Sequence, residues 1–442
     1  MKTFSCNCCL FVCLSVPQIV HAAPQPLRLS PLPAAREPWI GRLTPSGEGE
    51  NIHQVVFAQD AAKYTAAGFE WPWLNVIGVQ GRGLSTIKNV NTPAYNFVFN
   101  PRWLPDGSTV FQYGPNDGSS ALFSLARWDT KSNQAQTLVF GLSWKLVQPS
   151  PSGRYLAFIR GGQPIPGRGG ATPASLCTLD LTTNREKTWG ASEPLFGSVA
   201  WGQSDTLLFS LAPSDDEQKA TRPADGKTKP LAWTPKIYAA SLSKGQIKTL
   251  VEDGQRPAPS PDGKWLLYLS SRDPSPPKPQ DAPTVKPDPT VAQSQGNALF
   301  LVLARADGSQ ARLVRREERG APDIVWLRDS SGFVLCDTRF AGASEGKTAL
   351  SVAISRCELP TLAPKRVGTL RYIAPLGTNM SEDERLWRPI AVTRDNRYLM
   401  SELTQFEAPP NNGLMLGRFD LSSGASETVA HIGSVRGLDW RE

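Results

Sequence analysis

The chain repeats one arrangement of short apolar segments on either side of a tight turn. The clearest copies are Asn100–Gly107 and Arg256–Gly263, each followed by a second apolar run. In both turns proline presets φ, aspartate accepts local backbone N–H groups, and glycine takes the positive φ that the turn needs. We therefore predict a β-hairpin at each copy, with Gly107 and Gly263 at positive φ. Weaker copies of the turn occupy 149–153, 201–205, 326–330 and 392–396.

Two further apolar segments follow each hairpin. The expected third strands are Ala121–Leu125, Leu176–Leu181, Ile237–Leu242, Leu299–Ala304, Leu350–Ile354 and Leu414–Leu421. The expected fourth strands include Gln136–Val139, Lys187–Trp189, Lys248–Val251, Arg312–Val314 and Glu427–Val429. Four antiparallel strands per repeat are typical of a propeller blade, and blades bury their faces by packing around a common axis. The fold class is therefore all-β, and the architecture is a β-propeller.

The two ends of the chain bear on the number of blades. Residues 36–95 contain a turn and later strands, whereas Val435–Trp440 resembles a first strand with no strands after it. Because Trp440 corresponds to Trp103 and Trp326 in their repeats, we expect the C-terminal strand to complete the N-terminal blade. This would close a ring of seven blades and remove two open sheet edges. Six blades is the alternative, with residues 36–95 as an N-terminal cap.

The Trp-x-Pro-Asp-Gly sequence at Trp103–Gly107, followed by an apolar strand, resembles the WD-like repeat of the TolB family of bacterial envelope propellers. It also resembles the propeller domains of prolyl oligopeptidase and dipeptidyl-peptidase relatives. The resemblance covers nearly the whole chain after residue 22 and implies the fold, because the motif residues shape a turn and touch no substrate. TolB-like proteins carry an N-terminal α/β domain before a six-bladed ring, whereas residues 24–95 show no βαβ pattern.

Composition agrees with many short strands and gives a moderately basic protein. The 442 residues include 39 Pro and 37 Gly, which disfavour long helices and favour turns. The 47 Lys and Arg residues against 40 Asp and Glu give a net charge of +7, without a basic block of the kind that binds nucleic acid. We expect no nucleic-acid partner and a modest attraction to anionic partners.

The first 22 residues have the features of an export signal. Lys2 provides a positive charge, Cys9–Val16 is apolar, and Ala22 ends a small-residue cleavage site. We expect a signal peptide at 1–22, a single propeller domain at 23–442, and a product in the periplasm or secreted. A lipid anchor at Cys13 is disfavoured because Val12 precedes it. No apolar run reaches the length of about 18 residues that would predict a membrane span.

Candidate catalytic chemistry is weak. Gly342–Gly346 matches G-x-S-x-G, but we expect it in a loop between strands rather than on a strand-to-helix turn. His53 and His431 are expected at opposite ends of the ring, and no metal-ligand spacing is present. We therefore predict no catalytic residue, metal or cofactor. A propeller enzyme of lyase or hydrolase type, acting on a carbohydrate or peptide at the central channel, remains the alternative. The turn aspartates are expected to be structural: Asp106, Asp262, Asp329 and Asp395.

Other residues are assigned to packing rather than chemistry. Trp103, Trp201, Trp326 and Trp440 are expected to pack between blades. We expect no disulfide between Cys336 and Cys357, because a hairpin centred near residues 343–344 would place Cys336 opposite a residue near Ser351.

The long loops carry the functional prediction. Connections between second and third strands are expected at Gly161–Ser175, Ala212–Lys236, Asp273–Asn297, Arg339–Thr348 and Gln405–Gly413. Strand alternation places them at one end of the ring, and long loops are often functional. We predict that this end binds a partner, an envelope protein or a cell-wall polymer, through Arg160, Arg168, Arg272 and Arg339, because arginine holds carboxylate and phosphate groups. We expect a monomeric binding scaffold rather than an enzyme.

Overall fold

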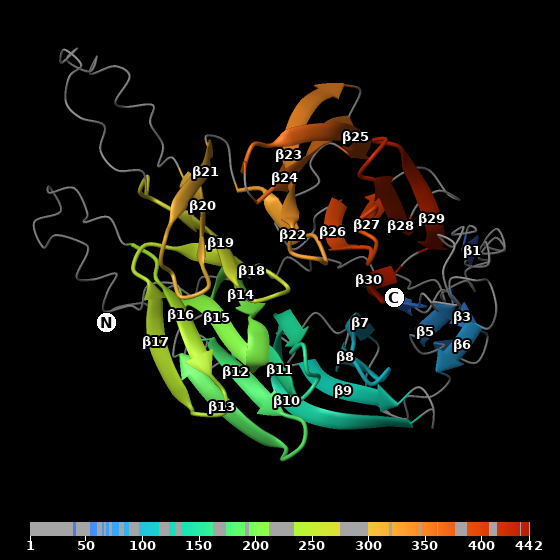
Figure 1. Ribbon diagram of the computed structural model, residues 1–442. Coiled ribbons are helices and arrows are strands. Elements are labelled where there is room, and N and C mark those ends of the chain that lie inside the picture. The colour runs from blue at the N-terminus through green and yellow to red at the C-terminus, as the bar shows by residue number, and fades with distance from the viewer. Residues whose placement is uncertain are drawn as a thin grey trace, which may run out of the picture. The chain divides into compact units, whose positions relative to one another are not determined.

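Figure 1 shows a computed structural model in which the described elements are strands, apart from one 3-10 turn at Gln203–Asp205. All described strands belong to the unit Arg36–Glu442. The structure describes residues 39–40, 54–59, 64–65, 68–69, 73–78, 84–87, 97–114, 123–129, 134–161, 174–190, 194–211, 234–274, 299–317, 321–344, 347–359, 361–375, 387–405, 413–433 and 435–441. No helix among these residues is long and apolar enough to cross a membrane.

Three sheets consist of four consecutive antiparallel strands each, as the repeat predicts. The first contains β14 (Pro194–Trp201), β15 (Thr206–Leu211), β16 (Ile237–Ser241) and β17 (Gln246–Val251). The second contains β18 (Gln255–Pro259), β19 (Trp265–Ser270), β20 (Leu299–Arg305) and β21 (Arg312–Glu317). The third contains β22 (Asp323–Trp326), β23 (Gly332–Ser344), β24 (Lys347–Glu358) and β25 (Lys365–Pro375).

A fourth sheet has seven strands and corrects the expected number of blades. It contains β7 (Phe97–Trp103), β8 (Thr109–Gly114), β9 (Phe123–Asp129), β10 (Gln134–Pro149), β11 (Tyr155–Arg160), β12 (Ser175–Asp180) and β13 (Arg185–Gly190). The 16-residue β10 pairs with β9 up to Leu142 and with β11 from Leu142 onward. The prediction of seven blades is therefore wrong, because the described strands form six sheets of four or more strands.

The remaining two sheets combine strands from both ends of the chain. In one, β26 (Trp387–Val392), β27 (Tyr398–Gln405), β28 (Gly413–Asp420) and β29 (Ser426–Gly433) are joined at the edge by β1 (Trp39–Ile40). In the other, β2 (Gln54–Gln59), β5 (Trp73–Gly78) and β6 (Leu84–Ile87) are joined by β30 (Val435–Arg441). The register of β2 and β30 sets Val55 opposite Trp440. A short pair, β3 (Tyr64–Thr65) and β4 (Gly68–Phe69), stands apart from them.

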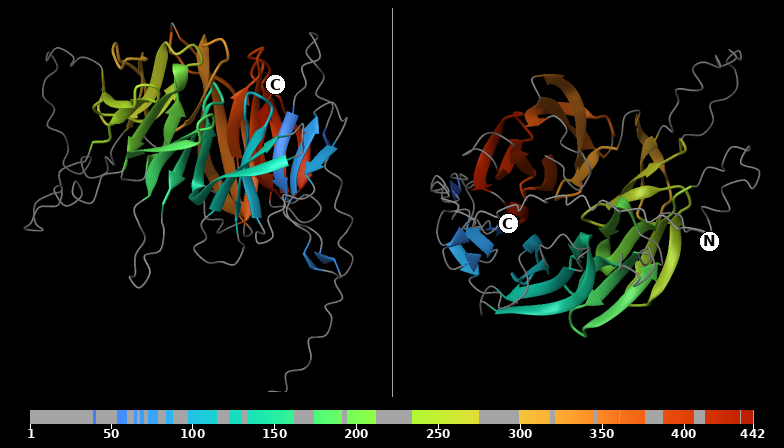
Figure 2. Two further views of the ribbon diagram at one scale, coloured as in Figure 1. Left: turned by 90° about the horizontal axis from the view of Figure 1, so that it is seen from below. Right: turned by 180° about the vertical axis from the view of Figure 1, so that it is seen from behind.

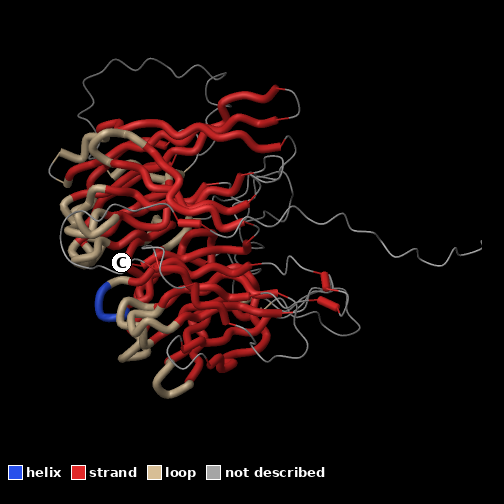
Figure 3. The backbone as a smooth tube through the Cα atoms, turned by 90° about the vertical axis from the view of Figure 1, so that its right-hand side faces the viewer, coloured by secondary structure: helices blue, strands red, loops and turns tan. Residues whose placement is uncertain are grey.

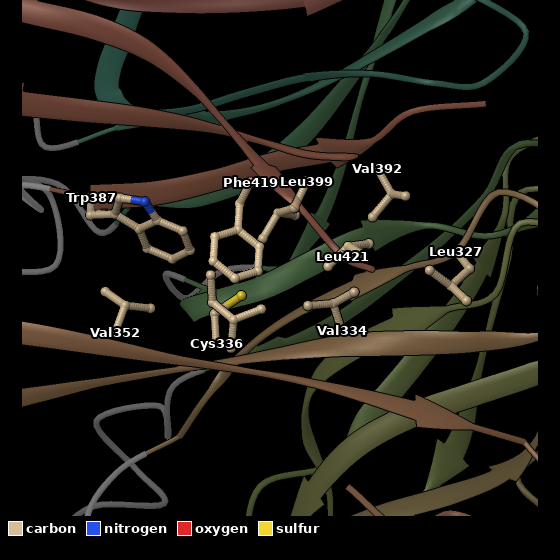
Figure 4. Packing of buried hydrophobic residues seen from close by; sticks show 10 residues of the cluster. Leu327, Val334, Cys336, Val352, Trp387, Val392, Leu399, Phe419 and Leu421 are labelled. Carbon is tan, nitrogen blue, oxygen red and sulfur yellow. The ribbon is translucent and has the colours of Figure 1, made fainter. Parts of the chain in front are cut away.

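The sheets are arranged around a common centre, with the first strand of each nearest to it (Figures 1 and 2). Neighbouring sheets pack through apolar faces. In Figure 4, Val334, Cys336 and Val352 of one sheet face Leu399 and Phe419 of the next. This packing buries the apolar side chains of both sheets and holds adjacent blades together.

Tryptophans of the first strands add hydrogen bonds between sheets. The Trp201 indole N–H donates to the carbonyl of Gln148 at 3.1 Å, and that of Trp326 donates to the carbonyl of Ala258 at 2.8 Å. The predicted packing role between blades is confirmed for these two tryptophans. The side chain of Trp440 lies outside the described residues.

The turn between first and second strands has the predicted backbone. Gly107 and Gly263 have φ of 85° and 64°, which confirms the prediction of positive φ. In the less regular copies, Asp205, Ser330 and Asn396 occupy the same turn position at φ between 53° and 60°. The turn is therefore kept even where glycine is replaced.

One predicted loop is instead a pair of extended strands. Residues 339–348 were expected to connect two strands, but β23 continues to Ser344 and β24 starts at Lys347. The two strands stay paired up to the tip, where Ser344 lies opposite Lys347. The tip therefore lies two residues later than expected, and Cys336 is opposite Ile354 rather than a residue near Ser351. Cys177, Cys336 and Cys357 are free and buried.

Candidate binding face at the loop end

The antiparallel order gives each sheet two different ends. The turn end carries the connections between first and second strands and between third and fourth strands. The loop end carries the connections between second and third strands and from one sheet to the next. In Figure 3 the described turns, in tan, gather at one side of the strands.

The turns between first and second strands touch one another around the turn end. We call these turns, residues 104–107, 150–153, 202–205, 260–263, 327–330 and 393–396, the turn belt. The backbone N–H of Asp262 donates to Ser330 Oγ at 2.9 Å, and that of Arg328 donates to Asn396 Oδ1 at 2.7 Å. Ser152 Oγ donates to Asp205 Oδ2 at 2.5 Å. In these three cases the side chain of the fourth turn residue thus accepts a hydrogen bond from the preceding turn.

The turn aspartates serve their own hairpins, as predicted. Asp262 Oδ1 accepts hydrogen bonds from Ser260 Oγ at 2.7 Å and from the backbone N–H of Lys264 at 3.1 Å. Burial would raise the pKa of Asp262, but these hydrogen bonds outweigh it and lower the pKa. The pKa of Asp329 is lowered first by the backbone N–H of Ser331. These carboxylates stabilise separate turns and do not converge on one site.

Arg160 lies at the loop end of β11, where the sequence predicts it, but it is engaged within the fold. Its Nε donates to Glu186 Oε1 at 2.6 Å, and its second amino group pairs with the other carboxylate oxygen. Its guanidinium also lies 5.9 Å from the ring centroid of Phe158. The hydrogen bond to Glu186 is the main cause that raises the pKa of Arg160. A ligand would have to share this arginine with Glu186.

Arg272 follows β19 on a backbone fixed by hydrogen bonds. The backbone N–H of Arg272 donates to Ser270 Oγ at 2.9 Å, and the Ser270 and Ser271 hydroxyls donate to Asp253 Oδ2 at 3.1 and 2.8 Å. Its Nε is 3.7 Å from Asp253 Oδ2, and its side chain is 78% exposed. Arg272 therefore combines a held backbone with a guanidinium open to solvent.

Arg339 is exposed on β23, beside a charged cluster that sequence reasoning missed. We define the charged cluster as Arg315, Glu317 and Asp337. Arg315 Nε donates to Glu317 Oε1 at 2.6 Å, and Arg315 Nη1 donates to Asp337 Oδ2 at 2.9 Å, which links β21 to β23 of the next sheet. The side chains of Glu317 and Asp337 are only 6% and 13% exposed.

The electrostatics of the charged cluster follow from burial. Burial raises the pKa of Glu317, and the neighbouring Asp337 adds to this, while Arg315 and Arg339 oppose it. Residues two apart on a strand share a face, so Arg315 with Glu317 and Asp337 with Arg339 could have been recognised as two charged pairs. That the two pairs meet follows only from the packing of the sheets.

The four predicted arginines are not brought together into one compact site. Arg160, Arg272 and Arg339 belong to three different sheets, and Arg168 lies outside the described residues, as do most residues of the predicted long loops. The G-x-S-x-G sequence is not on a strand-to-helix turn, because Gly342–Ser344 is part of β23 and β24 begins at Lys347. No group of three or more metal-ligating side chains occurs in the described part of the chain.

Comparison with known proteins establishes the fold only. No family model matches the chain, and the comparison with curated proteins gives no match. Among solved structures, the tricorn protease is similar with a TM-score of 0.50 and 12% identity, over 89% of this chain and 36% of that one. The oligogalacturonate lyase of Vibrio parahaemolyticus has a TM-score of 0.46 and 13% identity, over 85% of this chain and 84% of the lyase chain. TolB from Acinetobacter baumannii has a TM-score of 0.35 and 13% identity, over 68% of this chain and 60% of the TolB chain.

The chain is therefore a β-propeller of four-stranded antiparallel blades, with TolB among its structural neighbours. It spans less than two thirds of the TolB chain. At these identities the similarity carries no activity or ligand from one protein to another.

Proposed function

We propose that this protein is an exported β-propeller that acts as a binding scaffold in the bacterial envelope, in the periplasm or outside the cell, and that it binds its partner at the loop end. The pairing of β30 with β2 supports a closed and rigid ring, because it unites the two ends of the chain in one sheet. A rigid ring suits a scaffold that presents loops in fixed relative positions.

The contrast between the two ends is the observation that carries this proposal. At the turn end, the turn aspartates and several turn residues are used by the fold itself. At the loop end, Arg272 has its backbone held and its guanidinium exposed, and Arg339 is exposed beside the charged cluster. Arginine presents a planar set of donors that matches carboxylate and phosphate groups. A partner that carries such groups fits Arg272 and Arg339 at the loop end.

The strands nearest the ring centre carry more arginines than carboxylates, and one of these arginines, Arg388, is paired with Glu402 of β27. The strands nearest the centre, β7, β14, β18, β22, β26 and β30, carry Arg102, Arg256, Arg388, Arg436 and Arg441 against Asp323 and Asp439. No histidine or glutamate occurs on these six strands. A site built from convergent carboxylates and histidines would need the opposite composition.

The experiment that tests the proposal compares three forms of the full chain in pull-down from envelope extracts. The first is the natural chain, and the second has Asp273–Asn297 shortened and Arg160, Arg168, Arg272 and Arg339 replaced by Gln. The third is a control with four turn-end cations replaced by Gln, namely Arg185, Lys244, Arg312 and Arg366, which are all exposed. We expect partners to be lost from the second form only. Equal capture by all three forms would contradict the proposal.

A further inference from the structure

The outer strand of one sheet differs from those of the others. At 11 residues β25 is longer than β13, β17 and β21, which have six residues each. It is the last strand in its sheet, so no described strand pairs with its outer edge. An exposed sheet edge presents unpaired backbone donors and acceptors that can accept another strand.

Two of these outer strands are also more highly charged than the second half of β25, whereas β17 (Gln-Ile-Lys-Thr-Leu-Val) has a single Lys and differs from β25 in length only. β13 contains Arg, Glu and Lys in its first three positions, and β21 contains three Arg and one Glu. Such charges discourage strand addition. In contrast, residues 370–374 of β25 read Leu-Arg-Tyr-Ile-Ala, with Arg371 as the only charge. This part of β25 has the composition of a strand that accepts a partner.

The neighbouring sheet limits which part of β25 is open. A Cβ at Gly368 would lie 2.8 Å from Phe419 Cζ, and a Cβ at Gly424 would lie 2.7 Å from the carbonyl oxygen of Val367. The first half of β25 is therefore in close contact with the β28–β29 hairpin. The second half, residues 369–375, extends toward the loop end together with the tips of β23 and β24.

Strand register brings basic residues to one rung in this open half. Arg339 of β23 lies opposite Ser351 of β24, which in turn lies opposite Arg371 of β25. Residues on one rung share a face, and the two outer positions are about 10 Å apart, at roughly 4.8 Å per strand. The next rung on that face begins with Asp337, whose carboxylate is paired with the Arg315 guanidinium. A strand added to β25 would therefore place one of its residues opposite Arg371 on this rung.

We propose that residues 369–375 of β25 accept an extended acidic segment of a partner protein as an additional strand. The partner residue opposite Arg371 is Asp or Glu, because opposite charges stabilise directly opposed strand positions. Its neighbours are β-branched or aromatic, to match Leu370, Tyr372 and Ile373. Backbone hydrogen bonds supply affinity, and the rung of Arg371 supplies specificity. This inference rests on the proposed function, of which it names the partner chemistry.

The test uses the full chain and fluorescent peptides of ten residues. One peptide has alternating Val and Thr with a central Glu, a second has Lys in place of Glu, and a third is the Glu peptide N-methylated at alternate residues. We expect saturable binding of the Glu peptide, and binding weaker by about tenfold for each of the other two, since charge reversal and loss of edge hydrogen bonds each cost on the order of 1.4 kcal/mol.

Two variants identify the edge. Arg371→Glu should reverse the preference, so that the Lys peptide binds better than the Glu peptide. The matched control is Arg312→Glu on β21, which should leave the preference unchanged. Equal binding of the Glu peptide and its N-methylated form would overturn the proposal, as would an unchanged preference in Arg371→Glu. A dimer of the natural chain in light scattering that Arg371→Glu abolishes would also overturn it, since the edge would then bind a second copy.

These failures are distinguishable from failure of the proposed function. If envelope partners are lost from the variant with four arginines replaced while no peptide binds, the loop end is functional but does not accept a strand. If the same partners remain bound to that variant, the proposed function itself is wrong.

Discussion

The fourth residue of the turn is the position at which single side chains matter most for this fold. Gly107, Gly153 and Gly263 adopt the positive φ that the turn needs, and Gly153 has a second constraint, because a Cβ would lie 2.6 Å from Pro105 Cδ of the preceding turn. The sequence predicts the positive φ because the turn type requires it. It does not predict that Ser330 and Asn396 bond to the preceding turn, since those contacts depend on the spacing between sheets.

Ser330 allows the backbone strain and the hydrogen bond to be measured separately. Ser330→Ala keeps a side chain at φ 60° and removes the acceptor for the Asp262 N–H, so we expect a loss of about 1 kcal/mol in the free energy of unfolding. Ser330→Gly also removes the acceptor but relieves the backbone, which offsets about 1 kcal/mol. Urea denaturation should therefore show Ser330→Ala as the less stable variant. Equal stability of the two variants would contradict this account of the turn.

Asp420 predicts how stability depends on pH. Burial would raise its pKa, but hydrogen bonds from Ser422 and Ser423 and the Arg397 guanidinium outweigh burial and lower the pKa from 3.8 to about 2. Because the folded pKa is below the unfolded one, the ionised carboxylate stabilises the fold fully above the unfolded pKa. This stabilisation is lost as pH falls toward 2.

The measurement is urea denaturation of the natural chain and of Asp420→Asn at about pH 7 and about pH 3. Both proteins should lose stability at the lower pH, because Asp106, Asp262 and Asp329 also have lowered pKa values. Asp420→Asn should lose less of its stability than the natural chain. An equal loss in both would show that Asp420 does not contribute.

At the scale of elements, the sequence predicts the strands well and their ends less well. The hairpins and the order of four strands follow from turn residues and apolar runs, and the structure confirms them. The sequence analysis divides residues 134–149 between two repeats, whereas β10 runs through them as one strand, and Leu138–Val147 contains no Pro, Asn or Asp that would end it. The extension of β23 and β24 is missed because the Gly and Ser residues near Ser344 resemble a loop while remaining compatible with a strand.

Trp326 tests the attachment of one sheet to the next. Its indole N–H donates to the carbonyl of Ala258, and its ring lies edge-on to Phe333 with centroids 5.4 Å apart. Trp326→Phe removes the hydrogen bond and should cost about 1 kcal/mol. Trp326→Ala also leaves a cavity between the sheets and should lower the free energy of unfolding by about 3–5 kcal/mol. Thermal unfolding of the two variants checks both values, and similar stability of both to the natural chain would show that this contact does not join the sheets.

At the scale of the whole molecule, the sequence predicts the propeller but only part of the candidate site. Arg160, Arg272 and Arg339 lie on or just after second strands, because strand alternation fixes which connection is at which end. Their surroundings are not predictable in this way. The pairing of Arg160 with Glu186 and the charged cluster beside Arg339 depend on contacts between strands and between sheets.

Export is a property of the whole chain and has a direct check. The proposed scaffold requires cleavage after Ala22, which would give a mature protein that starts at Ala23 and carries no lipid. Intact-mass measurement of the protein recovered from the periplasmic fraction should give the mass of residues 23–442. A mass with an attached acyl chain, or fatty-acid label at Cys13, would show a lipid-anchored protein instead.

The central claim is that the partner binds at the loop end, and site-specific photocrosslinking in living cells tests it most directly. A photoreactive phenylalanine derivative is placed in turn at Arg272 and Arg339 of the loop end and at Arg185 and Arg312 of the turn end, all of which are exposed positions. We predict covalent adducts with a partner from positions 272 and 339 and none from positions 185 and 312. Adducts from the turn-end positions alone would contradict the account and assign binding to the opposite end of the ring.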